Sequence, residues 1–302
     1  MRIQNYFDEL ERKIKETYKV AEEARALGYD PNNIVEIPLA RNMIERVEGI
    51  ISVVAPQLKN SGKAKRLEEL EEKYSKLDWR VAMIIGLEVA QEKFCEFKNK
   101  IEAMEVGIRV GLAYLSNGVV SSPLEGFTEL KINKRKDNKE YFCLMFSGPI
   151  RSAGTTITCG SIFVAEYIRK QMNYYEYDAT EEEIKRAIVE LYDYHEKINN
   201  LQYLPSEIEI DFMFRNLPIQ INGDHSEEID VSNYKDLERI GTNRLRNGFC
   251  LVLGEALTQK APKFWNKINK LYKEFNMEQW EFLEDFVNLQ KKVKALERKE
   301  ET

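Results

Sequence analysis

The segment from Ser147 to Thr156 has the residue types expected of a phosphate-binding turn. It contains Ser-Gly-Pro-Ile-Arg-Ser-Ala-Gly-Thr-Thr, between a predicted strand and a predicted helix. Small residues let an anion approach the backbone, and the first N–H groups of a helix point toward it. Arg151 offers a bidentate contact, and Ser152, Thr155 and Thr156 offer hydroxyl donors. The alternative is a tight turn in which a serine or threonine caps the helix.

This segment matches neither of the common glycine motifs for nucleotides. No lysine follows its glycine as GxxxxGK[ST] requires, and its glycines do not have the GxGxxG spacing. We therefore expect no ATP or NAD site here.

Two other basic segments are candidates for contact with phosphate groups. Gly241–Gly248 places Arg244 and Arg246 at a predicted helix start. Because these two arginines would not share a helix face, at most one needs to touch a given ligand. A predicted hairpin loop carries Lys134, Arg135 and Lys136, and basic hairpins often contact a nucleic-acid backbone. The alternatives are a solvated helix entry and a solvated loop.

The sequence offers little for catalysis or metal binding. Its four cysteines lie far apart and it has two histidines, so it lacks zinc ligands at short spacing. His195 is expected to be a hydrogen-bonded structural residue, and the acids of residues 207–211 to form a half-exposed face. We predict no catalytic residue, no metal site and no cofactor in this chain, and four reduced thiols in a reducing cytosol.

The elements that must position these segments begin with helices. Apolar residues recur at steps of three or four from Tyr6 to Leu27, with Gly28 as the stop. A short strand is expected at Ile34–Ile37. Further helices are predicted around residues 44–51, 63–76, 78–89 and 98–115. Residues 1–117 are therefore predicted to form a helical N-terminal subdomain.

The pattern changes after Asn117. Strands are predicted at residues 127–132, 141–146, 219–221 and 229–231. Helices are predicted to start just after Arg151, at the Thr180 capping box and at Glu207, and to span residues 242–260, 263–275 and 277–296. Residues 118–296 are thus predicted to form a mixed part with short antiparallel strands and long helices. Residues 297–302 are predicted to form a charged tail. The predicted fold class is α+β, mostly helical.

Composition narrows the choice of function. The chain has 302 residues with 45 Lys and Arg against 51 Asp and Glu, a net charge of −6, which excludes a globally basic, histone-like binder. Residues 119–155 nevertheless carry six basic side chains against four acidic ones, so a small basic surface remains. We find no signal-peptide pattern and no run near the roughly 18 apolar residues that span a bilayer. We predict a soluble cytoplasmic protein without a membrane partner.

Several sequence blocks follow one another in a characteristic order and spacing over nearly the whole chain. They are Gly118–Gly126, Gly148-Pro149-Ile150-Arg151-Ser152, Leu201–Ser206, Glu228–Ser232, Thr242–Arg246, Leu251–Leu253 and Gln259–Ala261. Together they resemble the N-terminal region of the large subunit of the archaeal family D DNA polymerase (DNA polymerase II), and the block Gly148–Ser152 is the most specific of them. Two departures replace family glycines, one at Thr155 and one at Asn247.

The resemblance implies roles in assembly and in DNA contact. The large subunit of this family is several times longer, and its catalytic barrels, metal-binding aspartates and zinc modules lie C-terminal to this region. We therefore expect this chain to be a fragment of that subunit or the product of a split gene. The implied partners are the remainder of the large subunit, the small exonuclease subunit, DNA and a second copy of the chain. Mg²⁺ is expected for the holoenzyme and not for this chain.

Our leading hypothesis is a non-catalytic, N-terminal assembly and DNA-contacting module of a replicative polymerase. It would contact the DNA backbone through Arg151, through Arg244 or Arg246, and through the basic hairpin. One alternative is a stand-alone enzyme that uses the Gly148–Thr156 turn as a phosphate cradle. Another is a purely structural dimerisation module.

Overall fold

The computed structural model describes residues 2–29, 39–117 and 121–300, and it confirms the predicted fold class. Helices dominate, around a small sheet of three strands. The helices are α1 (Arg2–Ala26), α2 (Met43–Val54), α3 (Lys63–Tyr74), α4 (Trp79–Ala90), α5 (Lys100–Leu115), α6 (Thr155–Gln171), α7 (Glu181–Lys197), α8 (Glu207–Asn216), α9 (Asn247–Cys250), α10 (Ala261–Ile268), α11 (Leu271–Glu274) and α12 (Phe282–Glu300). The predicted strand at residues 34–37 lies outside the described residues.

Side-chain caps explain where several helices start. Asp78 Oδ1 accepts a 2.9 Å hydrogen bond from the N–H of Arg80 at the start of α4. Thr180 forms the predicted capping box with Glu183 at the start of α7. Each cap satisfies a backbone N–H that the helix itself leaves unpaired. Both predicted helix starts are therefore confirmed.

Helices α4, α5 and α6 pack unusually closely because glycines line their contacts. A Cβ atom on Gly107 of α5 would lie 2.4 Å from the carbonyl oxygen of Gly86 in α4. One turn further along the same face of α5, a Cβ atom on Gly111 would lie 2.8 Å from Val164 of α6. One hydrophobic core consequently runs across residue 117, from Ile44 to Phe286. The predicted division of the chain at that residue stays a prediction.

The sheet has the strand order β1-β2-β3, with β1 (Phe127–Lys134), β2 (Glu140–Phe146) and β3 (Gln220–Asn222). Strands β1 and β2 form the predicted antiparallel hairpin. The predicted antiparallel pairing therefore holds for these two strands, whereas β3 pairs with β2 in parallel and makes the sheet mixed. A parallel neighbour needs a crossover connection, and α6, α7 and α8 provide it. The predicted strand at residues 229–231 is reduced to an isolated bridge between Asp230 and Arg244.

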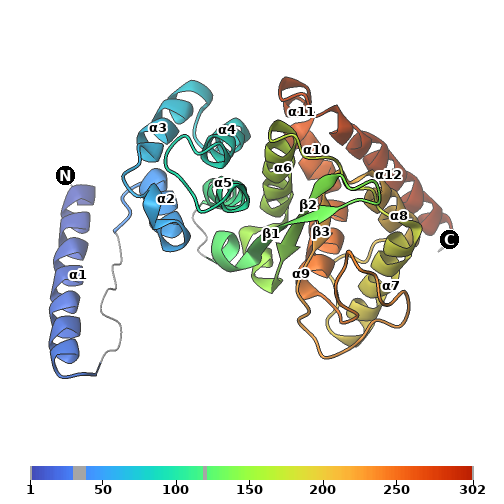
Figure 1. Ribbon diagram of the computed structural model, residues 1–302, viewed down its shortest axis with the longest axis horizontal. Coiled ribbons are helices and arrows are strands. Elements are labelled where there is room, and N and C mark those ends of the chain that lie inside the picture. Colours follow the sequence, from blue (N-terminus) through green and yellow to red (C-terminus); the bar gives the residue numbers. More distant parts are fainter. Residues whose placement is uncertain (1, 30–38, 118–120, 301–302) are drawn as a thin grey trace.

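Figure 1 shows the sheet between two groups of helices. Helix α6 lies against α4 and α5 on one side and against the helix Leu251–Thr258 and α10 on the other. Helices α8 and α12 pack together beyond the sheet. The helix predicted at residues 263–275 is interrupted, and Asn276, with a left-handed φ of 53°, follows α11. Helix α12 continues to Glu300, so most of the predicted charged tail is helical.

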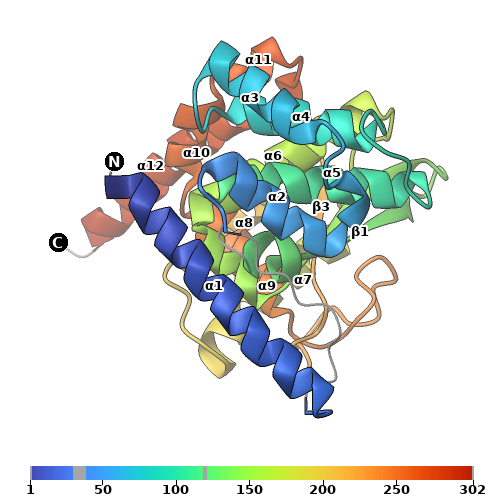
Figure 2. The ribbon, with the colours of Figure 1, turned by 90° about the vertical axis from the view of Figure 1, so that its left-hand side faces the viewer.

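Helix α1 adds nothing to this core, although its predicted span is confirmed. Among the described residues, no side chain of α1 belongs to the hydrophobic core. Its apolar residues include Ile3, Tyr6 and Val20, which are 74%, 59% and 65% exposed. Figure 1 draws α1 apart from α2, and Figure 2 shows it in the foreground when the molecule is viewed from that end. Over the described ranges, no helix is both long enough and apolar enough to cross a membrane.

Candidate nucleic-acid interface

The basic hairpin turn is shaped by its own backbone. The N–H of Arg135 donates to the carbonyl of Lys139 at 2.9 Å, and the N–H of Asn138 donates to the carbonyl of Arg135 at 3.0 Å. Asn138 has a φ of 64°, a left-handed conformation that asparagine tolerates better than most residues. The turn therefore projects its side chains from a fixed frame.

The charges of the hairpin divide into paired and unpaired groups. Arg135 lies 3.4 Å from both Asp137 and Asp178, and Lys139 lies 3.2 Å from Asp137. Lys134 and Lys136 are exposed, and neither has an ion-pair partner in the part of the chain that the structure describes. Of the three hairpin residues predicted to contact phosphate, these two lysines are free to do so.

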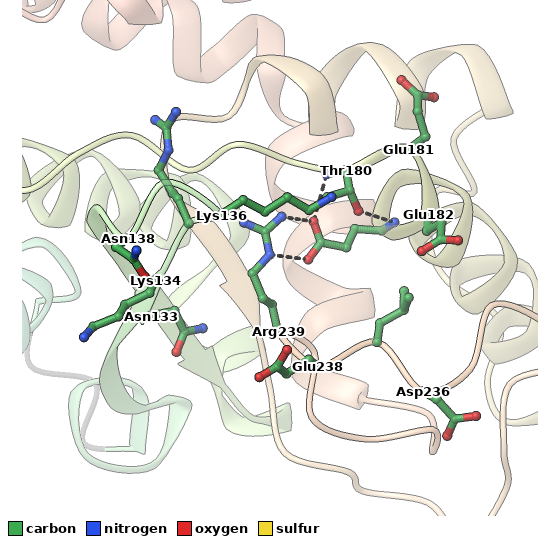
Figure 3. A pocket seen from close by; sticks show the side chains of 13 residues that line it. Asn133, Lys134, Lys136, Asn138, Thr180, Glu181, Glu182, Asp236, Glu238 and Arg239 are labelled. Carbon is green, nitrogen blue, oxygen red and sulfur yellow. Dashed lines mark hydrogen bonds and ion pairs between the residues drawn. The ribbon is translucent and has the colours of Figure 1, made fainter.

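A hollow of about 1030 Å³ separates the hairpin from the start of α7 (Figure 3). Its hairpin side carries Lys134, Arg135 and Lys136, and its far wall carries Glu181, Glu182, Asp236 and Glu238. An anionic ligand is therefore favoured only along the hairpin side. The hollow is polar and of mixed charge, unlike the mostly apolar pockets that enclose small molecules.

Arg239 forms part of this hollow and was not anticipated from the sequence. Its guanidinium stacks on the rings of Tyr141 and Tyr177, at 5.6 Å and 5.2 Å from their centroids. Burial alone would lower the pKa of Arg239, but hydrogen bonds to Glu183 and Asp178 raise it above its ordinary value. These contacts hold the loop that follows β3 against α7, so Arg239 has a structural role.

The Gly148–Thr156 turn does not form an open cradle. Residues Gly148–Ala153 form a short 3₁₀ helix, so α6 begins at Thr155 and not just after Arg151. The Ser152 hydroxyl lies 2.7 Å from the Pro149 carbonyl oxygen, to which it donates. It also lies 2.6 Å from the hydroxyl of Ser121. Thr155 and Thr156 are half-buried in the first turn of α6.

Arg151 is already paired across this turn. Its Nη2 atom lies 2.9 Å from Oε1 of Glu255, a residue that is only 1% exposed. The same oxygen accepts a hydrogen bond from the N–H of Gln202 at 2.9 Å. Arg151 keeps 37% of its side chain exposed, so it can still reach a ligand with its remaining donors. The geometry favours the tight-turn alternative and gives no support to a deep phosphate cradle.

The predicted helix start at residues 242–246 is wrong, and the two arginines there have different environments. The helix begins at Asn247, where a Cβ atom on Gly248 would lie 2.1 Å from the carbonyl oxygen of Phe146. Arg244 is half-exposed and lies 2.8 Å from Glu228. Arg246 is buried and 1% exposed. Arg244 therefore stays a candidate for DNA contact, whereas the position of Arg246 gives no support to such a role.

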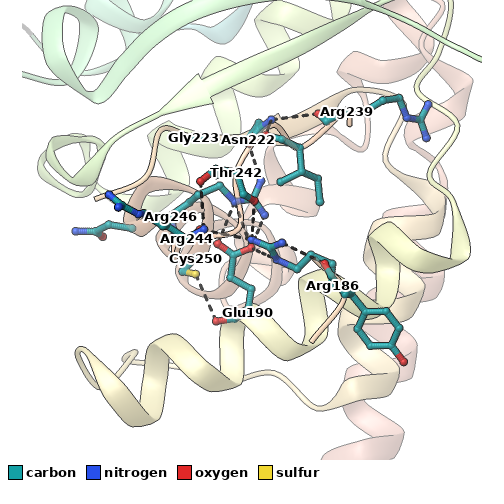
Figure 4. Close-up of polar contacts among 12 residues, drawn as sticks. Arg186, Glu190, Asn222, Gly223, Arg239, Thr242, Arg244, Arg246 and Cys250 are labelled. Atoms are coloured by element: carbon teal, nitrogen blue, oxygen red, sulfur yellow. Dashed lines mark hydrogen bonds and ion pairs between the residues drawn. The ribbon is translucent and has the colours of Figure 1, made fainter. Parts of the chain in front are cut away.

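Arg246 belongs to a buried cluster of charges (Figure 4). Its Nη2 lies 2.5 Å from Glu190 Oε2, and its Nη1 donates to Asn222 Oδ1 at 2.6 Å. Arg186 approaches the same Glu190 oxygen at 3.0 Å. The guanidinium of Arg186 also donates to the carbonyls of Tyr234 and of Thr242. These bonds fasten the irregular chain between β3 and α9 to α7.

The sequence contained one signal for this cluster that we missed. Arg186 and Glu190 are four residues apart on α7, and Glu190 shares a helix face with the buried Ala187, three residues before it. A charged pair on an otherwise apolar helix face is expected to be buried and to need further partners. That pattern would have pointed to the interior of the fold and not to a DNA-contacting surface.

The remaining residues singled out from the sequence have structural roles or form no metal site. His195 Nδ1 accepts a 3.0 Å hydrogen bond from the N–H of Leu201, which confirms the predicted hydrogen-bonded histidine. Within the described ranges, no group of three or more His, Cys, Asp or Glu side chains is placed to hold a metal ion.

The family model and the relatives that match this chain all carry the same description. A family model described as DNA polymerase II large subunit DP2, N-terminal, matches residues 5–289. The chain is 46% identical over 290 residues to a DNA polymerase II large subunit of Nanoarchaeum equitans, covering 96% of this chain and 23% of that protein. It is 42% identical over 279 residues to the DNA polymerase II large subunit of Methanosarcina barkeri, and this match covers 92% of this chain and 23% of that protein.

A more distant relative gives the same result. The chain is 38% identical over 300 residues to a DNA polymerase II large subunit of Pyrococcus furiosus, covering 99% of this chain and 23% of that protein. The chain thus spans about a quarter of the length of the curated relatives that it matches.

Proposed function

The chain belongs to the family of N-terminal regions of the DNA polymerase II large subunit, and we propose that it is an assembly and DNA-contacting module of such a polymerase. On this proposal it supports DNA-templated DNA synthesis and carries no catalytic centre of its own. Its partners are the remainder of the large subunit, the small exonuclease subunit and DNA. Mg²⁺ would act in the holoenzyme, on residues outside this chain.

The observation that carries the DNA-contact part is the pair of free lysines on a rigid turn. Lys134 and Lys136 are exposed, and within the described residues neither has an ion-pair partner. Phosphate contact by such a lysine displaces counterions and breaks no existing salt bridge. Arg244 and Arg151 are secondary candidates, because each would bind a phosphate in addition to, or instead of, a carboxylate that it already contacts.

The observation that supports assembly is the exposed apolar face of α1. Helix α1 has 25 residues with an amphipathic pattern, and Leu10 and Ile14 lie partly exposed on its apolar face. An amphipathic helix gains most of its stability from packing that face against a partner. The remainder of the large subunit, the small subunit and a second copy of the chain are all candidates for that partner.

Fluorescence anisotropy with single-stranded and double-stranded DNA tests the DNA-contact part. We expect binding at low salt, and we expect the logarithm of affinity to fall linearly with the logarithm of salt concentration. The slope should be about 0.9 per phosphate contact on duplex DNA and about 0.7 on a single strand. No binding at low salt, or binding that ignores salt, would contradict this part.

Co-purification with the separately expressed remainder of the large subunit and with the small subunit tests the assembly part. The double variant Leu10→Asp/Ile14→Asp should abolish association, because it places charges on the apolar face of α1. The matched control exchanges an ion pair on the polar face, Arg12→Glu with Glu16→Arg, and should associate normally. If the chain forms a homodimer by light scattering and binds neither DNA nor these subunits, the purely structural alternative holds.

A further inference from the structure

Tyr175 is an exposed aromatic residue beside the basic hairpin. It is 49% exposed, whereas its neighbours Tyr174 and Tyr177 are packed against aromatic residues of β2. The ring of Tyr174 lies 5.1 Å from Phe142, and that of Tyr177 lies 5.3 Å from Tyr141. Of these three tyrosines, Tyr175 therefore has the most ring surface available to a ligand.

The backbone of Tyr175 is held in place by the sheet. Its N–H donates to the carbonyl of Glu140 at 2.8 Å, and the residue forms a parallel bridge with Tyr141. Arg135 reinforces this contact from the hairpin, because its Nη1 donates to the carbonyl of Glu176 at 3.2 Å. A ring on a fixed backbone loses little conformational entropy when a ligand stacks on it.

The surroundings of Tyr175 are basic on the hairpin side. The ring borders a hollow of about 400 Å³ that Lys100, Lys139 and Glu140 also line. The ammonium of Lys139 lies 4.7 Å from the ring centroid. Lys100 is exposed and has no ion-pair partner within the described residues. A planar ring at the edge of a hollow that two lysines line matches a nucleobase with its flanking phosphates.

This hollow adjoins the larger one described above. Asn138, at the hairpin turn, lines both of them. A chain of phosphates could therefore pass from Lys100 and Lys139, around the turn, to Lys136 and Lys134. The acidic far wall of the larger hollow would keep that path on the hairpin side.

We propose that Tyr175 is a stacking platform for an unpaired base, and that the surface formed by Tyr175, Lys100, Lys139, Lys136 and Lys134 binds single-stranded DNA in preference to duplex. This inference rests on the proposed DNA contact and specifies which form of DNA the surface prefers. Bases in a duplex are stacked on one another and offer no free face to Tyr175. The lysines alone would not make this distinction, because both forms of DNA carry phosphates.

The test uses the 302-residue chain with a fluorescent oligothymidylate and with a duplex of equal length. Tyr175→Ala should weaken single-strand binding about 5- to 150-fold, the range for loss of one stacked base, and leave duplex binding and the salt slope unchanged. Tyr175→Phe should retain wild-type affinity, because it keeps the ring. Tyr29→Ala, which removes an exposed tyrosine that follows α1, should have no effect.

Crosslinking provides a second measurement that does not depend on affinity. An oligothymidylate that carries 5-iodouracil should crosslink to Tyr175 on irradiation, and mass spectrometry of the digested chain should locate the adduct there. Equal losses for single strand and duplex in Tyr175→Ala, or normal single-strand binding by that variant, would overturn the inference while leaving the salt-dependent DNA contact in place. If wild type binds neither form of DNA, the proposed DNA contact itself fails.

Discussion

Oε2 of Glu190 lies 2.5 Å from Nη2 of Arg246, and both side chains are buried. The two residues come from α7 and from the irregular segment that leads into α9. Because Arg186 shares the same carboxylate, a single buried acid neutralises part of the charge of two guanidinium groups. This relationship ties the loop between β3 and α9 to the rest of the fold.

Glu190→Gln should strongly destabilise the chain. The amide keeps the shape of the side chain but leaves Arg186 and Arg246 buried without a counter-charge. Breaking a buried ion pair in this way costs about 3–5 kcal/mol. Urea unfolding followed by circular dichroism measures the change in the free energy of unfolding. The control Glu181→Gln removes an exposed partner of Arg215 and should leave the urea midpoint nearly unchanged. Equal midpoints for both variants would contradict the assigned role of Glu190.

Lys134→Ala/Lys136→Ala should weaken DNA binding and make it less sensitive to salt. Each lost phosphate contact should reduce the salt slope by about 0.7 on single-stranded DNA and by about 0.9 on duplex. Anisotropy titrations at several salt concentrations measure this slope. The control Lys65→Ala/Lys76→Ala removes the same number of positive charges, one from the first turn of α3 and one from just after its end. It should leave the salt slope unchanged. Identical slopes for the two double variants would show that the hairpin lysines do not contact phosphates.

Arg151→Ala should lower stability, because it leaves the buried Glu255 without its charged partner. The cost of such an unsatisfied buried group is about 1–3 kcal/mol. The double variant Arg151→Ala/Glu255→Gln should recover part of this loss, since it also removes the buried charge. If Arg151 contacts DNA, both variants should bind DNA weakly; if its role is purely structural, the double variant should bind normally. Urea unfolding and anisotropy together separate the two roles.

Cys95 should be the most reactive of the four thiols. The other three, Cys143, Cys159 and Cys250, are fully buried. Burial raises the pKa of Cys143 to about 12 and that of Cys250 well above its ordinary value. Because the thiolate is the nucleophile, iodoacetamide should modify Cys95 first in the native chain and all four residues after unfolding. Mass spectrometry of tryptic peptides checks this order, and rapid native labelling of Cys143 would contradict it.

Protonation of Asp193 should account for part of the folding stability that the chain loses in acid. Burial by itself raises the pKa of Asp193, but hydrogen bonds from Lys197 and from the N–H of Ser232 outweigh it, so the pKa lies below the ordinary value of 3.8. A lowered folded-state pKa contributes stability above the unfolded value, and this contribution is lost as the pH falls through the folded value.

Asp193→Asn should therefore be less stable than wild type at neutral pH, and the difference should shrink as the pH falls below 3.8. Thermal unfolding at a series of pH values measures it. Asp224→Asn, at an exposed position, serves as the control and should track wild type throughout. A constant difference between wild type and Asp193→Asn at all pH values would contradict this assignment.

The local structure was largely predictable from the sequence. Helix periodicity, the cap at Asp78, the capping box at Thr180 and the polar turn between β1 and β2 depend on residues within a few positions of one another. Such interactions leave a readable pattern because the backbone geometry of a helix or hairpin fixes which side chains meet. The ordered sequence blocks pointed to the family in the same way, and the comparisons confirm it.

The candidate site was only partly predictable, because long-range partners decide whether a charged residue faces solvent or the interior. Arg244 and Arg246 looked equivalent in the sequence, yet Arg246 is buried against Glu190, 56 residues away. Lys134 and Arg135 also looked equivalent, but Asp178 and the Glu176 carbonyl engage only the arginine.

The parallel pairing of β3 and the exposure of Tyr175 were likewise decided in three dimensions. Each depends on how a segment that follows β2 by one or more helices packs back against that strand. The sequence by itself therefore determined the elements, the family and the residue types available for chemistry. Only the tertiary structure decided which of those residues reach solvent, because burial and ion pairing depend on contacts between distant parts of the chain.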